Sequence, residues 1–110
     1  IDVIEEEKLI ERVKQMGVYL IDGLKRLQKV HTGIVEVRGA GLMVALELNG
    51  EKCTERGSQI QRVLRESGII VDYRPETACF RFFPPYVITQ KQIDFVLEAL
   101  NIGFRVTEEL

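Results

Sequence analysis

The chain has 110 residues, of which 45% are hydrophobic and 29% are charged, proportions typical of a soluble globular domain. A domain of this length buries roughly two-thirds of the surface that its unfolded chain exposes, so it can form a core of its own. Its 15 basic and 17 acidic side chains leave a net charge of -2, which argues against nucleic acid or an anionic membrane surface as a partner. No apolar run approaches the ~20 residues that a membrane span requires.

The two cysteines, Cys53 and Cys79, have no spacing typical of a metal site, and the single His31 does not complete one. We therefore expect no metal ion. Because the sequence also lacks a secretion signal and a dense cysteine framework, we expect free thiols and a cytoplasmic location. The first residue is Ile rather than Met, so we expect the chain to begin inside a longer gene product.

An amphipathic helix is predicted over residues 9–30, because apolar or small side chains recur there every three or four positions. These positions are Ile10, Val13, Gly17, Leu20, Leu24 and Leu27. Gly33 is a candidate for the left-handed residue that ends this helix. An earlier turn at residues 2–7 is either separate from the helix or its beginning.

A strand is predicted over residues 34–38, where apolar and charged side chains alternate with a period of two. Val35 and Val37 are expected on the same face of this strand. A glycine-rich interruption follows, and the alternation then predicts a second strand over residues 42–48.

After an Asn-Gly turn, residues 54–67 have helical spacing and end before Gly68. Two further short strands are predicted at residues 69–71 and 79–83, and a double proline ends the second of them.

The last helix is predicted to begin at Thr89, because Thr89 and Gln92 have the spacing of a capping box. Ile88 and Ile93 are placed to form the hydrophobic staple around this helix start. The apolar face behind it consists of Ile93, Val96, Leu97, Leu100 and Phe104.

The predicted order is α-β-β-α-β-β-α, which indicates an α+β fold with a small, mostly antiparallel sheet of three to four strands and helices packed on one face. We expect residues 1–110 to form a single domain. The other face of the sheet carries Met43, Ala45, Cys79 and Phe83, and their apolar character suggests that a partner domain partly covers it.

Arg81 is the candidate binding residue, since it places a charge in the most aromatic strand, residues 79–83. A guanidinium in this position must reach solvent, pair with a protein carboxylate, or face a cleft where a ligand supplies the anion. Its planar fork can bind a carboxylate through two parallel hydrogen bonds. The alternative is an arginine on an edge strand with a partner at the surface.

Arg38, Gly39 and Gly41 form a weak candidate for a phosphate loop, because a strand rather than a helix follows them. We interpret the glycines as a bulge or sharp turn where another part of the backbone approaches closely. Arg38 is then expected to donate structural ion pairs, with Glu36 and Glu47 among its possible partners.

His31 lies where the C-terminus of a helix favours a cation, which predicts a surface or capping role rather than catalysis. The six lysines fall on polar helix faces or in loops, so none resembles a desolvated nucleophile.

Several segments closely resemble the C-terminal part of class III aminotransferases. They are VIEEE at residues 3–7, MGVYL at 16–20, VRGAGLM at 37–43, FRFFPPYVIT at 80–89 and QID at 92–94. The resemblance covers nearly the whole chain, and so many motifs in the same order make chance similarity improbable.

The resemblance implies that the chain is the C-terminal small domain of a type I pyridoxal-phosphate enzyme, with residues 1–8 as the end of an inter-domain helix. In that family a large domain holds pyridoxal 5'-phosphate on a lysine. The enzyme moves an amino group from an amine or amino acid to a keto acid such as 2-oxoglutarate or pyruvate. Because the lysine belongs to the large domain, this chain alone is expected to bind no pyridoxal phosphate and to be inactive. The parent enzyme is expected to be a homodimer.

The arginine in the R-F-x-P-P motif of this family commonly binds a substrate carboxylate, and Arg81 occupies that position. The resemblance implies no catalytic residue in this chain. The expected structural or domain-interface residues are Arg38, Gly39, Gly41, Pro84 and Pro85. Tyr86 stands where the family usually has Leu, which leaves the amine donor open.

Two other interpretations differ in what they predict for the chain by itself. A free-standing small-molecule-binding or regulatory α+β domain without enzymatic activity would bind amino acids specifically. A purely structural fragment would have no ligand affinity and would expose an apolar surface where a larger domain docks.

Overall fold

A computed structural model of the protein describes residues 3–40, 43–83 and 88–108. Its helices and strands are, in order, α1 (Val3–Val30), β1 (Ile34–Ala40), β2 (Met43–Leu48), α2 (Cys53–Glu66), β3 (Asp72–Arg74), β4 (Cys79–Phe82) and α3 (Gln90–Val106). This order confirms the predicted α-β-β-α-β-β-α sequence of elements and the α+β class.

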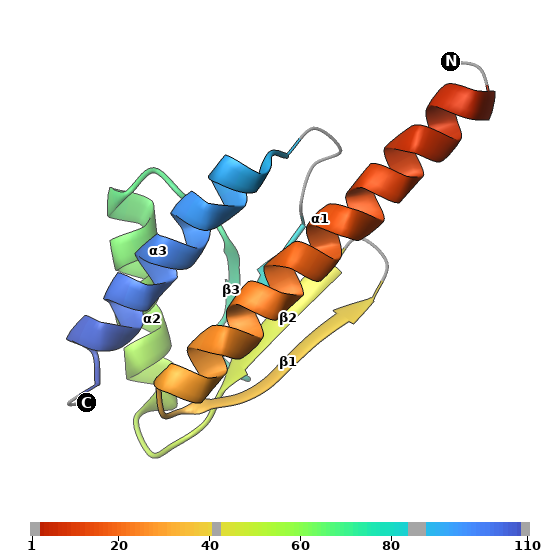
Figure 1. Cartoon of the computed structure of the whole chain (residues 1–110). Coiled ribbons are helices and arrows are strands. Elements are labelled where there is room, and N and C mark those ends of the chain that lie inside the picture. Colours follow the sequence, from red (N-terminus) through yellow and green to blue (C-terminus); the bar gives the residue numbers. More distant parts are fainter. Residues whose placement is uncertain (1–2, 41–42, 84–87, 109–110) are drawn as a thin grey trace.

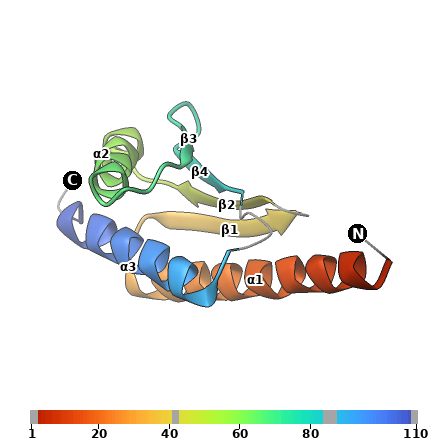
Figure 2. The same cartoon turned by 90° about the horizontal axis from the view of Figure 1, so that it is seen from above.

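The four strands form one antiparallel sheet in the order β1-β2-β4-β3, so β2 and β4 are its inner strands. Figure 2 shows α1 and α3 on the same side of β1 and β2. The core between the helices and the sheet includes Leu24, Leu46, Ile60, Phe80 and Leu100, all without exposed surface. Because α2 contributes Ile60 to this same core, the prediction that the helices pack on one face is confirmed.

Helix α1 is continuous over 28 residues, so the early turn is the beginning of the main helix. Its C-terminal part packs on the sheet, with Leu20 and Leu24 buried. Its N-terminal part extends beyond the sheet (Figure 1), and Ile10 is exposed there. No helix in the described ranges combines the length and the apolar character needed to cross a bilayer.

Strand β1 contains an irregularity at Val35 that changes the face of the sheet to which this side chain belongs. The pairing passes from Ile34 opposite Leu48 to Glu36 opposite Glu47, which leaves Val35 as an extra residue. Ile34 belongs to the core, whereas Val35 is exposed. The prediction that Val35 shares the face of the next valine is therefore wrong, because a bulge shifts the alternation by one residue.

Strand β3 is Asp72–Arg74, later in the chain than the predicted strand at residues 69–71. Gly68 has a φ of 85°, and the N–H of Ile69 bonds to the carbonyl of Leu64 at 2.8 Å. This is the Schellman motif that ends many helices. The prediction was wrong because residues 69–71 first complete the end of α2 and pairing with β4 begins only after them.

The capping box at the start of α3 is confirmed. The backbone N–H of Thr89 bonds to Oε1 of Gln92 at 2.9 Å, and the N–H of Gln92 bonds to Oγ1 of Thr89 at 3.2 Å. Ile93 is buried in the core and Ile88 packs against that core, as the hydrophobic staple requires.

Candidate functional site

Arg81 lies on the inner strand β4, with β2 on one side and β3 on the other. Its neighbours Phe80 and Phe82 are buried in the core, so the Arg81 side chain belongs to the opposite face of the sheet. In the strand register it stands opposite Ala45 of β2 and Asp72 of β3. The alternative of an edge-strand arginine is therefore wrong.

The face of the sheet that points away from the helices, the open face, is rich in charge. By strand alternation it carries Glu36, Arg38, Met43, Ala45, Glu47, Asp72, Arg74, Cys79 and Arg81, which confirms the predicted placement of Met43, Ala45 and Cys79. Ala45 and Cys79 are buried among longer side chains, in keeping with the apolar character predicted for this face. The open face is more charged than the sequence predicted, because the prediction did not place the charged residues of β1 and β3 on the same surface as Ala45 and Cys79.

Arg81 differs from Arg38 and Arg74, the other arginines of the open face, in having no ion pair with a described carboxylate. The Nε atom of Arg74 lies 3.2 Å from Oδ1 of Asp72, its neighbour on the same strand face. Arg81 forms no ion pair with any carboxylate in the part of the chain that the structure describes. Arg81 as a residue is partly buried, and it has no protein anion among the described residues.

Arg38 contacts both carboxylates that the sequence suggested as partners. Its Nη1 atom lies 3.2 Å from Oε2 of Glu36 and 3.9 Å from Oε2 of Glu47. At Gly39 a side chain would meet the end of Ile21 from α1, so a helix side chain, not another backbone, makes the close approach. Gly41, Pro84 and Pro85 lie outside the described residues.

A hollow of about 220 Å³ opens beside Arg81, where residues 69–71 are not paired with β4. Its walls are mostly apolar and include Val71, Ile70 and Phe83. Ile70 is 93% exposed and Phe83 is 59% exposed. Leu20, Ile93 and Val96 also line this hollow, so much of its wall belongs to the helix side of the sheet, whereas the Arg81 side chain belongs to the open face.

The chain offers no buried amine that could hold a carbonyl cofactor covalently, because all six of its lysines are exposed. Among the residues described, no group of three or more His, Cys, Asp or Glu side chains is arranged to bind a metal ion.

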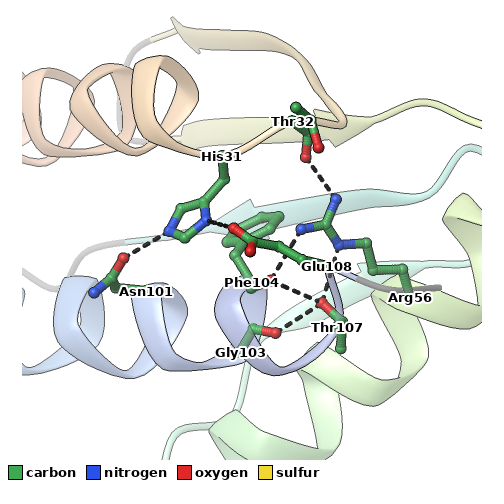
Figure 3. Close-up of polar contacts among 8 residues, drawn as sticks. All are labelled: His31, Thr32, Arg56, Asn101, Gly103, Phe104, Thr107 and Glu108. Atoms are coloured by element: carbon green, nitrogen blue, oxygen red, sulfur yellow. Dashed lines mark hydrogen bonds and ion pairs between the residues drawn. The ribbon is translucent and has the colours of Figure 1, made fainter.

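A second polar site, the helix-end cluster, joins the C-terminal ends of α1 and α3 to α2 (Figure 3). It consists of His31, Arg56, Asn101, Thr107 and Glu108. His31 is only 5% exposed, with Nδ1 2.7 Å from Oε1 of Glu108 and Nε2 2.6 Å from Oδ1 of Asn101. The predicted surface position of His31 is therefore wrong, because the end of α3 covers it.

Arg56 is the central residue of the helix-end cluster and is 7% exposed. It donates from Nε to Oγ1 of Thr107 at 2.9 Å, from Nη2 to the carbonyl of Phe104 at 3.0 Å, and from Nη1 to the carbonyl of Thr32 at 2.5 Å. Burial lowers the pKa of Arg56, and the nearby Glu108 opposes this effect. Sequence analysis missed Arg56, because nothing distinguishes it from the exposed arginines of an amphipathic helix. Its bonds all go to the protein, so the cluster serves to join the helix ends.

Most of the chain is similar in sequence to class III aminotransferases. The family model for class III aminotransferases matches residues 1–102. An ornithine aminotransferase of Staphylococcus carnosus is 38% identical over 104 residues, and an acetylornithine aminotransferase of Methanosarcina acetivorans is 39% identical over 101 residues. These alignments cover 94% and 92% of this chain but 24% of each relative.

Solved structures give the same result for the fold. A transaminase from the marine bacterium Virgibacillus matches with a TM-score of 0.83 at 27% identity, over 97% of this chain and 26% of that protein. The lysine aminotransferase of M. tuberculosis in its internal aldimine form matches with a TM-score of 0.80 at 31% identity, over 96% of this chain and 23% of that protein. The chain therefore spans about a quarter of the length of the proteins that it matches.

Proposed function

Since this chain belongs to the class III aminotransferase family, we propose that it forms the C-terminal small domain of a pyridoxal-phosphate-dependent aminotransferase. The proposed partner is a large domain of the same protein, which holds pyridoxal 5'-phosphate on a lysine. The cofactor supplies the carbonyl group that carries an amino group between substrates. The parent enzyme then transfers the amino group from an amine or amino acid to a keto acid such as 2-oxoglutarate or pyruvate. A cytoplasmic location and a homodimeric parent belong to the same proposal.

The contribution proposed for this domain is to bind the substrate carboxylate through Arg81. One observation carries the proposal: the partly buried Arg81 has no carboxylate partner among the described residues, whereas on the same face Arg38 has two and Arg74 has one.

The strand also suits Arg81 for orienting a substrate. Hydrogen-bonded strands flank β4 on both sides, and the core holds Phe80 and Phe82 on either side of Arg81. A guanidinium based on such a rigid strand binds a carboxylate with little loss of conformational entropy. The fork geometry fixes the direction of the bound carboxylate as well as its position.

Arg38 and Gly39 are proposed to be structural residues near the interface with the large domain. The ion pairs of Arg38 join it to Glu36 on β1 and to Glu47 on β2, and Gly39 lets Ile21 of α1 approach β1, which supports a structural role for both residues. The same role is proposed for Gly41, Pro84 and Pro85 from the family resemblance alone.

Kinetics of Arg81 variants in the complete enzyme test the proposal. Arg81→Gln removes the charge, and we expect it to raise the KM for the carboxylate substrate. The fall in kcat/KM should correspond to a loss of about 2–5 kcal/mol of transition-state stabilisation. Arg81→Lys keeps the charge without the fork and is expected to lose less. An amine donor that has no carboxylate is the matched control and should be unaffected. Unchanged kinetics for every carboxylate substrate would contradict the assignment.

A further inference from the structure

The turn between β2 and α2 contains an asparagine that is followed directly by a glycine, Asn49 and Gly50. Both residues are exposed, and Gly50 has a φ of 113°, in the region that favours glycine. The N–H of Asn49 donates to the carbonyl of Gly33 at 2.8 Å, and the carbonyl of Gly50 accepts from the N–H of Cys53 at 3.3 Å. The peptide bond between Asn49 and Gly50 therefore lies at the surface, between two fixed points of the turn.

The side chain of Asn49 and the backbone nitrogen of Gly50 are both available for a reaction with each other. Within the described ranges, the side-chain amide of Asn49 has no hydrogen-bond partner, and the N–H of Gly50 donates to no protein oxygen. A Cβ atom at Gly50 would meet no described heavy atom within 4 Å apart from its chain neighbours. Because glycine has no side chain to shield its nitrogen, that nitrogen can approach the amide carbon of Asn49.

We propose that Asn49 is a site of spontaneous deamidation, since asparagine is one of the thermolabile residues of proteins. Hydroxide removes the proton of the Gly50 nitrogen, and this nitrogen attacks Cγ of Asn49. The bond from Cγ to the side-chain nitrogen breaks, and ammonia leaves after taking a proton from water, which restores the hydroxide. The new bond from Cγ to the Gly50 nitrogen closes a succinimide ring.

Water then opens the succinimide at either of its two carbonyl carbons. One opening gives aspartate, and the other gives isoaspartate, in which the main chain runs through the former side chain of Asn49. The reaction consumes one water molecule and releases one ammonia molecule, and it requires no oxidant or reductant. The product carries a carboxylate in place of the neutral amide.

The other asparagine of the chain, Asn101, has the protections that Asn49 lacks. It lies inside α3, its Oδ1 atom is 2.6 Å from Nε2 of His31, and Ile102 follows it. The helix holds the backbone N–H of Ile102 in a hydrogen bond, and the β-branched side chain crowds that nitrogen. The two asparagines are therefore a matched pair within one molecule.

The two products are expected to affect the turn differently. Asn49 lies between the buried Leu48 of β2 and Lys52 at the N-cap of α2. Isoaspartate adds a carbon atom to the main chain there, and we expect it to displace α2, whose Arg56 is the central residue of the helix-end cluster. Aspartate keeps the length of the main chain and places a negative charge before the N-terminus of α2, where the helix dipole favours it.

Peptide mapping of the complete enzyme by mass spectrometry, during incubation at neutral and at alkaline pH, tests the proposal. The peptide with Asn49 is expected to gain the mass difference between an amide and a carboxylic acid, to contain both products, and to react several-fold faster at alkaline pH. The peptide with Asn101 should stay intact. Asn49→Gln is the control variant and should stay intact as well, because closing its larger ring is slower. An Asn49 peptide as stable as the Asn101 peptide would overturn the proposal.

A comparison with urea-unfolded enzyme separates the reactivity of the sequence from protection by the fold. The Asn49 peptide is expected to react at comparable rates in the native and the unfolded enzyme. A native rate many times slower would contradict the proposal, because it would show that the folded enzyme blocks the reaction. Neither experiment requires turnover, so the result is independent of the role proposed for Arg81.

Melting temperatures test the expected displacement of α2. Aged wild-type enzyme that contains isoaspartate should melt at a lower temperature than fresh enzyme, whereas Asn49→Asp should melt nearly as the fresh wild type does. Aged Asn49→Gln is the control for other effects of incubation and should not change. If isoaspartate accumulates at Asn49 and the melting temperature stays the same, the displacement of α2 is wrong.

Discussion

Arg56 carries a positive charge into the interior of the domain and donates to three neutral oxygen atoms there. Two of these are the carbonyls of Thr32 and Phe104, near the C-terminal ends of α1 and α3, where the helix dipoles place partial negative charge. The ring of Phe104, with its centroid 5.1 Å from the guanidinium carbon, adds a cation–π contact. Helix ends thus take the place of a carboxylate partner.

Arg56→Met is expected to lower the free energy of unfolding by about 3 kcal/mol. The substitution keeps most of the side-chain volume, but it leaves buried oxygen atoms without their charged donor. Urea denaturation measures the change. Arg62→Met on the same helix is the control, because Arg62 is exposed, and it should alter stability by no more than about 0.5 kcal/mol. Equal effects of the two substitutions would show that the helix-end cluster adds no stability.

At the residue scale, sequence analysis succeeded where a residue conflicts with its local surroundings. Arg81 could be singled out because a charge in an aromatic strand is visible in five residues of sequence. The burial of His31 was missed because its partner Asn101 is 70 residues away in the chain. Such a contact depends on how α3 packs against α1, and no local pattern encodes it.

Two helical glycines, Gly17 in α1 and Gly57 in α2, have opposite surroundings. A Cβ atom at Gly17 would have no heavy atom within 4 Å. A Cβ atom at Gly57 would overlap the ring and hydroxyl of Tyr73, which lies on β3 and packs against Phe80 with ring centroids 4.6 Å apart. Gly57 therefore allows α2 to approach the sheet closely, whereas Gly17 has no such packing role among the described residues.

Alanine at these two positions should change stability in opposite directions. Gly17→Ala is expected to stabilise the protein by up to about 1 kcal/mol, because alanine has the better helix propensity. Gly57→Ala gains the same propensity but is expected to destabilise by about 1–3 kcal/mol, because the helix and Tyr73 must move apart. Thermal denaturation of the two variants gives the comparison. A stabilising effect at both positions would mean that Tyr73 moves aside at little cost.

At the element scale, the sequence could predict every helix and the order of all the elements, because helical spacing and the capping box at Thr89 and Gln92 are local patterns. The strands were predicted less well. Residues 69–71 have strand composition but complete the end of α2, and the bulge at Val35 reverses one side chain. Both errors arise because strand register is decided by the neighbouring strand and the preceding helix end.

The continuity of α1 could not be predicted, since its first residues carry many charges and no apolar stripe. From Glu7 onward, where the structure describes the side chains of α1, the first buried one is Val13, one turn after the exposed Ile10. The turn at residues 7–10 is therefore largely exposed and is joined to the sheet through the packed part of the same helix.

Glu11→Pro tests whether this continuity matters for function. Proline at this exposed position breaks the helix between the projecting part and the packed part without changing a buried side chain. In the complete enzyme we expect kcat/KM to fall on the order of tenfold to a hundredfold, because small displacements of a binding group reduce reactivity strongly. Glu11→Ala is the control and should retain activity. Full activity of the proline variant would show that the projecting part need not be rigidly joined to the sheet.

A helix of 28 residues is about 42 Å long, close to the 51 Å of the longest dimension of the domain. Such a rod transmits torque, because its two ends cannot twist independently of each other. The helix joins its projecting turns to Leu24 and Leu27, which share the core with Leu46 of β2 and Phe80 of β4. We therefore expect a displacement of the projecting turns to be felt at the strand that carries Arg81.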